Sequence, residues 1–238
     1  MSPKRFSASY AARFISCPGS ADLENSIPGF QYPKQDEEKG ARGKGTRLHS
    51  WLAETAEWSA KDLRNIAEAL TYVADLKAER RFKVLSETTI EATWLKKSPH
   101  TTVDLVLYLQ DELHIVDWKT GVIPVSPVNN AQLMYYALCF MHLAPKAEGA
   151  WLHIIQPWIP DGCASWWVSA EALADFMVLA QQTEQKILTR DKTLSPSDHC
   201  TFCPAYPHSR SEKGRPLCPV TMQLLYPDPF DEEEVLAL

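Results

Sequence analysis

The first third of the chain carries apolar residues at the three- and four-residue spacing of amphipathic helices. Residues 7–16 fit a short helix with Ser7 as its N-cap. A polar segment rich in charge, glycine and proline follows over 25–44 and predicts a loop. From 45 to about 82 the helical spacing returns, and we expect two helices there, broken near Ser59.

After residue 82 the apolar positions fall in short runs and two-residue alternations, which are typical of strands. The strands are expected over residues 83–94, 102–109, 113–119, 149–156 and 165–168. Helices are expected over 130–143 and over 169–188, the latter with Ser169 as its N-cap. The turn at 110–112 predicts a hairpin. This order of elements predicts an α/β fold with a central mixed sheet flanked by helices.

The segment 189–238 has few regular signals and contains seven prolines. A segment this irregular rarely holds itself together by burying apolar surface, so we expect a staple there. With 238 residues, the chain is expected to form a single domain. Its predicted parts are an N-terminal helix and loop, a core, a cysteine-rich segment and an acidic tail, over 1–44, 45–188, 189–220 and 221–238.

The formal net charge of −6 argues against a general nucleic-acid binder, because such proteins are usually basic. Part of this charge lies in an acidic run at 231–234, in a tail that we expect to be disordered and to offer a protein partner a docking segment. No apolar run approaches the length of a membrane span, and no signal-peptide core follows the basic N-terminus. We therefore expect a cytoplasmic protein that has no membrane partner.

Three charged residues in the predicted hairpin are candidates for chemistry. Asp104 lies inside an apolar strand, where a carboxylate is costly to bury unless it is paired or bound to a metal ion. Asp117 and Lys119 end the next strand, and their spacing of two places both on one face of the sheet. Two neighbouring carboxylates suit Mg²⁺, and the lysine can hold a phosphate oxygen. Taken alone, however, the Asp117–Lys119 spacing favours a surface salt bridge.

Further polar residues flank the hairpin and change this interpretation. His49 lies on a predicted helix face, and Glu87 lies on the strand that precedes the hairpin. Gln132 and Tyr136 are four residues apart, so they share one face of the next helix. Each residue also has an ordinary structural explanation, as a half-buried histidine, a solvated glutamate or part of an amphipathic helix. Their order along the chain nevertheless favours a shared site.

The ordered series resembles the PD-(D/E)XK superfamily, with its restriction-endonuclease-like core, and most of all the RecB-type nuclease branch. That branch carries a helical histidine, an aspartate, a D/E-x-K triplet and a Q-x-x-x-Y motif in this order, and the match here spans about residues 45–136. The resemblance implies ligands for Mg²⁺ or Mn²⁺ at His49, Asp104, Asp117 and the carbonyl of Trp118, with Glu87 as a further candidate. It implies catalytic or supporting roles for Asp104, Asp117, Lys119, Gln132 and Tyr136.

The chain has six cysteines, and a reducing cytoplasm makes disulfides between them unexpected. Cys200 and Cys203 form a C-x-x-C pair, whose two sulfurs can meet one centre from a tight turn. Cys17 and Cys218 are, like Cys203, followed by proline, a step that recurs at iron–sulfur clusters. These four residues predict either an iron–sulfur cluster or a structural Zn²⁺ site in which a nearby histidine replaces one cysteine.

The same four cysteines, one N-terminal and three C-terminal, resemble the iron–sulfur staple of several RecB-type nucleases. This resemblance implies a [4Fe-4S] cluster that clips the two chain ends together. The segments 17–20, 45–49 and 130–137 also resemble a phage-encoded subgroup of these nucleases, which implies a viral origin and a place in the host cytoplasm.

These features together predict a Mg²⁺- or Mn²⁺-dependent deoxyribonuclease, and in the first place an exonuclease, that serves DNA recombination, repair or phage DNA processing. Its partner would be DNA, either single-stranded or double-stranded with free ends. One alternative is a catalytically inactive nuclease fold that binds DNA or protein, although the intact Asp–Asp–Lys set argues against such decay. The other alternative is a zinc-stabilised interaction protein whose acidic tail carries the function.

Overall fold

The computed structural model describes residues 3–25, 60–203, 205–206 and 218–221. The chain divides into two compact units, each formed from separated stretches of sequence. The first unit takes Met1, Ala12–Gln31 and Gln182–Leu238, and the second takes Ser2–Ala11 and Tyr32–Gln181. Over the described residues, no helix is both long and apolar enough to cross a membrane.

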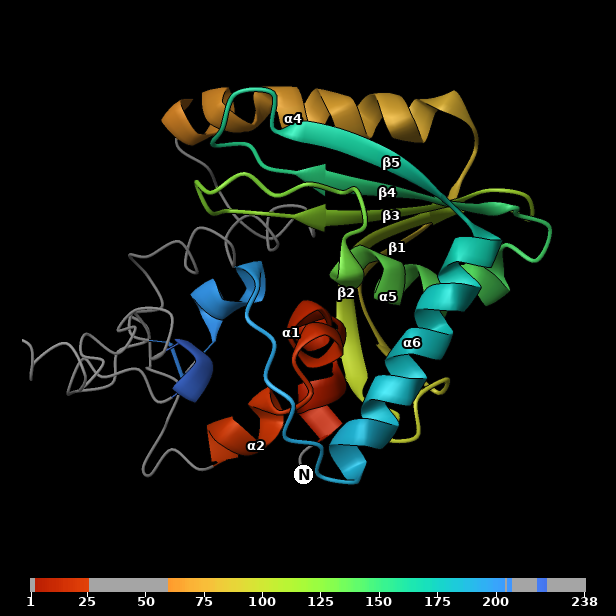
Figure 1. Cartoon of the computed structure of the whole chain (residues 1–238). Coiled ribbons are helices and arrows are strands. Elements are labelled where there is room, and N and C mark those ends of the chain that lie inside the picture. The colour runs from red at the N-terminus through yellow and green to blue at the C-terminus, as the bar shows by residue number, and fades with distance from the viewer. Residues whose placement is uncertain (1–2, 26–59, 204, 207–217, 222–238) are drawn as a thin grey trace, which may run out of the picture. The chain divides into compact units, whose positions relative to one another are not determined.

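The second unit is built on a five-stranded sheet with the strand order β1-β2-β3-β4-β5 (Figure 1). The strands are β1 (Lys83–Glu91), β2 (His100–Tyr108), β3 (Leu113–Trp118), β4 (Gly149–Ile155) and β5 (Cys163–Ser169). Neighbouring strands pair antiparallel except β3 and β4, which run parallel. The mixed sheet and its flanking helices confirm the predicted α/β fold, and all five predicted strands are present.

Helices precede, connect and follow the strands. The α-helices of the described residues are α1 (Ala11–Ser16), α2 (Ser20–Asn25), α4 (Ala60–Glu79), α5 (Ala131–Phe140) and α6 (Ala170–Leu188). The 3₁₀ turns are η1 (Pro3–Phe6), η2 (Ala8–Tyr10), η3 (Met141–Leu143) and η4 (Asp198–Phe202). Ser169 caps α6 as predicted, because its Oγ accepts a hydrogen bond of 3.1 Å from the Ala172 amide. The cap predicted at Ser7 is wrong: its side chain makes no capping hydrogen bond, because the chain enters α1 through 3₁₀ turns.

Several expectations concern residues outside the described ranges. The loop expected over 25–44 and the acidic tail fall almost entirely there, and so does the first of the two helices expected over 45–82. The second of those helices is α4, which begins one residue after the break expected at Ser59.

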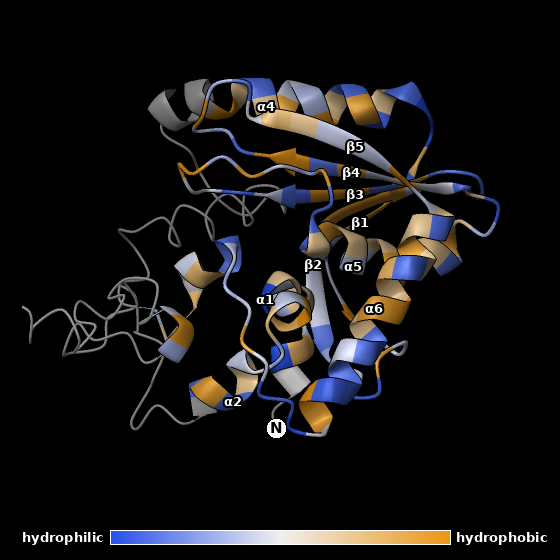
Figure 2. Cartoon of the chain, in the orientation of Figure 1, coloured by the Kyte–Doolittle hydropathy of each residue, from blue (hydrophilic) through white to orange (hydrophobic). Residues whose placement is uncertain are grey.

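Helix α4 covers one face of the sheet and α5 covers the other (Figure 1). Residues from α4 pack with residues of the central strands in one apolar cluster, formed by Ile66, Ala69, Val73, Leu76, Leu105, Leu107, Val116, Trp118 and Ile155. Side chains alternate along a strand, so Asp117, between Val116 and Trp118, points to the opposite face, toward α5. Figure 2 shows how apolar residues concentrate along β3 and β4.

Helix α5 is the crossover that the parallel pair β3 and β4 requires. Its N-terminus is capped by Asn130, whose side chain accepts hydrogen bonds from the amides of Gln132 (3.1 Å) and Leu133 (3.2 Å). Seven of its ten residues are buried, so packing fixes its rotation about its own axis. The helix therefore holds its polar residues at a defined place above β3.

A chain of polar side chains with two buried histidines at its centre runs beneath α4. The Tyr72 hydroxyl lies 2.8 Å from His153 Nδ1, and His153 Nε2 lies 3.0 Å from His114 Nδ1. His114 Nε2 in turn lies 2.9 Å from a carboxylate oxygen of Glu112. Burial lowers the pKa of His153 to about 3, with a further contribution from His114. Burial also lowers the pKa of His114, although Glu112 acts in the opposite direction.

This histidine pair predicts a loss of stability in mild acid. An unfolded histidine binds a proton near pH 6.5, whereas folded His153 binds one only near pH 3, so the unfolded chain holds more protons between these values. The free energy of unfolding should therefore fall as pH falls below about 6.5, by up to about 1.4 kcal/mol per pH unit for this residue. Urea unfolding at several pH values measures this slope.

The matched variants are His153→Gln, which removes the buried titrating group, and His142→Gln, which removes an exposed histidine. The slope between pH 6.5 and pH 4.5 should flatten in the first variant and keep the wild-type value in the second. Equal slopes in the wild type and His153→Gln would contradict the prediction.

Candidate active site

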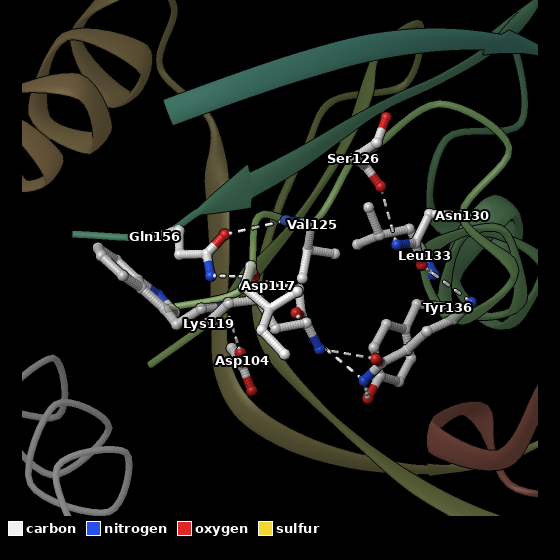
Figure 3. Close-up of polar contacts among 12 residues, drawn as sticks. Asp104, Asp117, Lys119, Val125, Ser126, Asn130, Leu133, Tyr136 and Gln156 are labelled. Carbon is white, nitrogen blue, oxygen red and sulfur yellow. Dashed lines mark hydrogen bonds and ion pairs between the residues drawn. The ribbon is translucent and has the colours of Figure 1, made fainter. Parts of the chain in front are cut away.

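The two aspartates of the predicted hairpin lie opposite each other on neighbouring strands. Leu105 pairs with Val116, and the next step of this antiparallel register sets Asp104 of β2 opposite Asp117 of β3. Residues opposite each other share a face of the sheet, so both carboxylates belong to the face that α5 covers. Asp104 Oδ2 accepts a hydrogen bond of 2.7 Å from the Trp118 amide, which fixes its side chain at the end of β3 (Figure 3).

A network of four side chains joins β3 to α5. Lys119 Nζ lies 2.8 Å from Asp117 Oδ2 and donates a hydrogen bond of 2.8 Å to Gln132 Oε1. Gln132 Nε2 donates to Asp117 Oδ1 at 3.1 Å and to the Tyr136 hydroxyl at 3.0 Å. The structure thus brings together the D-x-K and Q-x-x-x-Y residues, as their sequence spacing led us to expect (Figure 3). The glutamine amide orients the lysine and the aspartate at the same time.

Burial keeps the tyrosine neutral into the alkaline range. Desolvation raises the pKa of Tyr136 well above its usual value, and the negative charge of Asp117 raises it further. The Thr101 side chain, also hydrogen-bonded to Tyr136, acts in the opposite direction but does not reverse the shift. Tyr136 therefore remains a neutral phenol and supports Gln132 without adding negative charge to the site.

One oxygen of Asp117 is suited to accept a cation. The residue is only 3% exposed, and its Oδ2 has no partner in hydrogen-bond geometry, although the Lys119 ammonium lies 2.8 Å away. A buried carboxylate oxygen without a directed hydrogen bond is costly in a folded protein. Two carboxylates with a nearby main-chain carbonyl match the oxygen ligands that Mg²⁺ and Mn²⁺ take, with water completing the shell. The oxygen donors present are therefore of the kinds that such an ion takes.

Glu87 lies on β1, in line with Asp104 on β2 and Asp117 on β3 across the sheet. The register of β1 and β2 sets it opposite Asp104, between two paired positions, but it takes a left-handed φ of 46° and its side chain is exposed. Such a backbone angle is uncommon for a residue with a side chain. The structure thus places Glu87 at the exposed end of a row that continues through Asp104 to Asp117.

All the predicted ligands of the ion stay predictions. His49 lies outside the described residues. The amide of Trp118 is bound by Asp104, and its carbonyl lies at the end of β3. In the described ranges, no three side chains of His, Cys, Asp or Glu are arranged so that they could hold a metal ion.

The sequence analysis missed Gln156, which lies at the end of β4 and is 1% exposed. Its amide makes three hydrogen bonds to the backbone of the loop that follows Lys119, at Val125, Gly121 and Ile123. A glutamine that ends an apolar strand was the available signal, but only the fold shows which loop it holds.

The four cysteines of the predicted staple line one small cavity in the first unit. Cys203 donates its amide to the Cys200 carbonyl at 2.9 Å in the tight turn that a C-x-x-C pair forms. Cys17 and Cys218 line the same cavity, and His199 contributes beside them. Burial raises the pKa of the Cys17 and Cys203 thiols, and all four cysteines are free thiols. The fold thus gathers residues from both ends of the chain.

The solved structures that this chain matches include an alkaline exonuclease. That enzyme, from Laribacter hongkongensis, is 14% identical, with a TM-score of 0.35 over 75% of this chain and 91% of its own. The same exonuclease in complex with dAMP gives 12% identity and a TM-score of 0.33 over the same shares of the two chains. A third structure, of SSO0001, is 15% identical, with a TM-score of 0.34 over 78% of this chain and 91% of that one.

A family model matches the chain over residues 31–238, which include the hairpin, helix α5 and the three C-terminal cysteines. Its description is "Protein of unknown function (DUF2800)". Because the match covers far more than half of the sequence, the chain belongs to the DUF2800 family.

Proposed function

We propose that this protein is a metal-dependent deoxyribonuclease of the RecB type, with exonuclease action on DNA ends. The observation that carries the proposal is the network of Asp117, Lys119, Gln132 and Tyr136 beside Asp104. A surface salt bridge does not require a buried aspartate or a glutamine that holds both partners. This arrangement is better explained as a site that keeps an anion and a cation ready for a substrate.

The roles proposed for these residues follow from their positions, except that of His49, which follows from the sequence motif alone. Asp104 and Asp117, with the Trp118 carbonyl and His49, would hold Mg²⁺ or Mn²⁺. A bound ion would activate water and neutralise the charge that develops on a phosphodiester. Lys119 would donate a hydrogen bond to a non-bridging phosphate oxygen. These roles assign the chemistry to one end of β3.

Gln132 and Tyr136 act through their neighbours. Gln132 Oε1 fixes the Lys119 ammonium, while its Nε2 fixes Asp117 Oδ1, so the two charges keep a constant separation. The Tyr136 hydroxyl accepts a second hydrogen bond from Gln132 Nε2, and this bond keeps the glutamine amide from rotating. Asp117 and Tyr136 are buried, so the interactions that they make with Gln132 and Lys119 are stronger than they would be in solvent.

The net charge of −6 does not exclude a DNA substrate. A metal ion at the two aspartates would offset charge where the phosphate binds, and part of the acidic excess belongs to the run at 231–234. We propose that this run serves a protein partner or mimics DNA, and that the enzyme processes phage DNA in the host cytoplasm.

The cysteine cavity is proposed to hold a [4Fe-4S] cluster that staples the chain ends, with structural Zn²⁺ as the alternative. The support for this proposal is that Cys17 and the three C-terminal cysteines line one cavity. The C-terminal cysteines lie in a segment whose sequence has few signals of regular structure. The position of His199 beside Cys200, with Nε2 3.8 Å from Sγ, supplies the nitrogen that a zinc site would use.

A cleavage assay on three DNA substrates tests the proposed function. The full chain, freed of divalent ions and then supplied with Mg²⁺ or Mn²⁺, should degrade linear double-stranded and linear single-stranded DNA. Covalently closed circles should persist, because an exonuclease needs an end. Cleavage of circles at the same rate would contradict the exonuclease assignment, and no cleavage of any substrate with either ion would contradict the nuclease.

A further inference from the structure

The loop that follows Lys119 exposes two adjacent apolar side chains. Val122 is 74% exposed and Ile123 is 61% exposed, among the largest values for apolar residues in the described part of the chain. Single exposed apolar residues are common, but a neighbouring pair at the tip of a loop gains nothing for folding. This pair begins three residues after the lysine of the candidate site.

A buried side chain holds this loop in one conformation. Gln156 Oε1 accepts a hydrogen bond of 3.1 Å from the Val125 amide, as Figure 3 shows. Gln156 Nε2 donates to the carbonyls of Gly121 and Ile123, both at 2.7 Å. The side-chain amide of Gln156 therefore fixes both sides of the loop tip. Its three hydrogen bonds satisfy the polar groups that are buried with it.

The backbone of Gln156 is also held in place. Its backbone N–H donates to the Gly162 carbonyl at 2.7 Å, and its backbone carbonyl accepts from the Ile159 N–H at 3.3 Å. A Cβ atom at position 162 would lie 2.0 Å from the Gln156 carbonyl oxygen, so only glycine fits this close approach. The exposed tip is thus held by a constrained turn, and not by its own packing.

We propose that Val122 and Ile123 form an apolar contact surface for the bases and sugars of the DNA strand beside the active site, and that Gln156 is a positioning residue that holds it. The inference rests on the proposed nuclease function. Lys119 can bind a phosphate oxygen, and the nucleotide next to that phosphate presents apolar base faces and deoxyribose carbons. Apolar side chains pack against such groups without reading sequence.

The test compares two variants of the full chain with a matched control. V122S/I123S removes the apolar surface while the backbone can keep its hydrogen bonds. Q156E keeps the shape of the anchor but replaces the two N–H donors by an oxygen that faces two carbonyls. V84S/V178S is the control, because it removes two apolar side chains that are also exposed, on β1 and α6.

The substrate is a fluorescein-labelled linear oligodeoxynucleotide, assayed with Mn²⁺ for kcat and KM and with Ca²⁺ for binding by fluorescence anisotropy. V122S/I123S and Q156E should each raise KM and the dissociation constant by about tenfold, with kcat within about twofold of wild type. The control should match the wild type. Hydrogen exchange of the Gly121, Val122 and Ile123 amides should speed up in Q156E alone, because the Gly121 and Ile123 carbonyls lose the donors that hold the loop.

Unchanged KM and binding in V122S/I123S, beside a wild type that cleaves DNA, would overturn this inference and leave the nuclease function in place. A lower kcat at constant KM would also overturn it, because it would place the loop in the chemical step. A wild type that neither cleaves nor binds the oligonucleotide would overturn both proposals. The surface variant decides the question even if Q156E does not fold.

Discussion

Replacing Asp117 by alanine should lower the rate of DNA cleavage by about 10³-fold or more, which corresponds to about 4 kcal/mol of lost transition-state stabilisation. The variant loses a proposed ligand of the ion and a fixed partner of Lys119. The protein should stay folded, because the apolar cluster under α4 lies on the other face of β3. The Lys119 side chain, 27% exposed, can turn its charge toward water.

The matched control for this variant is Asp75→Asn, which changes an exposed aspartate of α4 on the opposite face of the sheet. It should cleave at the wild-type rate. Lys119→Met should lose activity as strongly as Asp117→Ala, whereas Lys77→Met in α4 should keep it. Cleavage within tenfold of wild type by both Asp117→Ala and Lys119→Met, with circular dichroism spectra unchanged, would sink the proposed site.

Replacing both Cys200 and Cys203 by serine should remove the bound metal and lower the melting temperature by about 10 °C or more. Between the end of α6 and Cys203 the structure describes only the short η4 turn, so this described stretch has little regular structure and is expected to depend on a staple. Metal analysis, visible absorption after anaerobic purification and thermal unfolding provide the measurement. Iron with visible absorption identifies a cluster, and colourless protein with zinc identifies the alternative.

Cys163→Ser is the control for the cysteine pair, since Cys163 is a partly exposed thiol on β5 that does not line the cavity. It should keep both the metal content and the melting temperature. A wild type that contains neither iron nor zinc after anaerobic purification would show that the four thiols pack against one another without a ligand. An unchanged melting temperature in the double variant would show that the site does not stabilise the segment.

Much of the second unit could be predicted because its local patterns agree with its tertiary contacts. The two-residue alternation of β2 and β3 and the turn between them indicate a hairpin, and the hairpin sets Asp104 near Asp117. Asn130 ahead of an apolar run marks the start of α5. Such signals depend on residues close in sequence, which is why the strands and this helix were predicted nearly correctly.

The remaining features depend on contacts between distant parts of the chain. His114 and His153 meet only because β3 and β4 pair in parallel, and no local pattern encodes that register. Gln156 binds a loop more than thirty residues earlier in the sequence. Ser7 has the residue type of a cap, but the 3₁₀ turn that it precedes offers a different geometry. Residue type and spacing therefore do not predict the histidine contact, the loop that Gln156 binds or the missing cap at Ser7.

The central position of β3 has a consequence for how this protein tolerates change. β3 has a paired strand on each side and all six of its residues are buried, so it opens only when the sheet as a whole unfolds, whereas β1 and β5 can fray at the edges. Asp117, which lies on β3, is therefore held in place until the whole unit unfolds. Substitutions elsewhere that weaken the fold would reduce the number of working molecules in a cell without altering the turnover of each one.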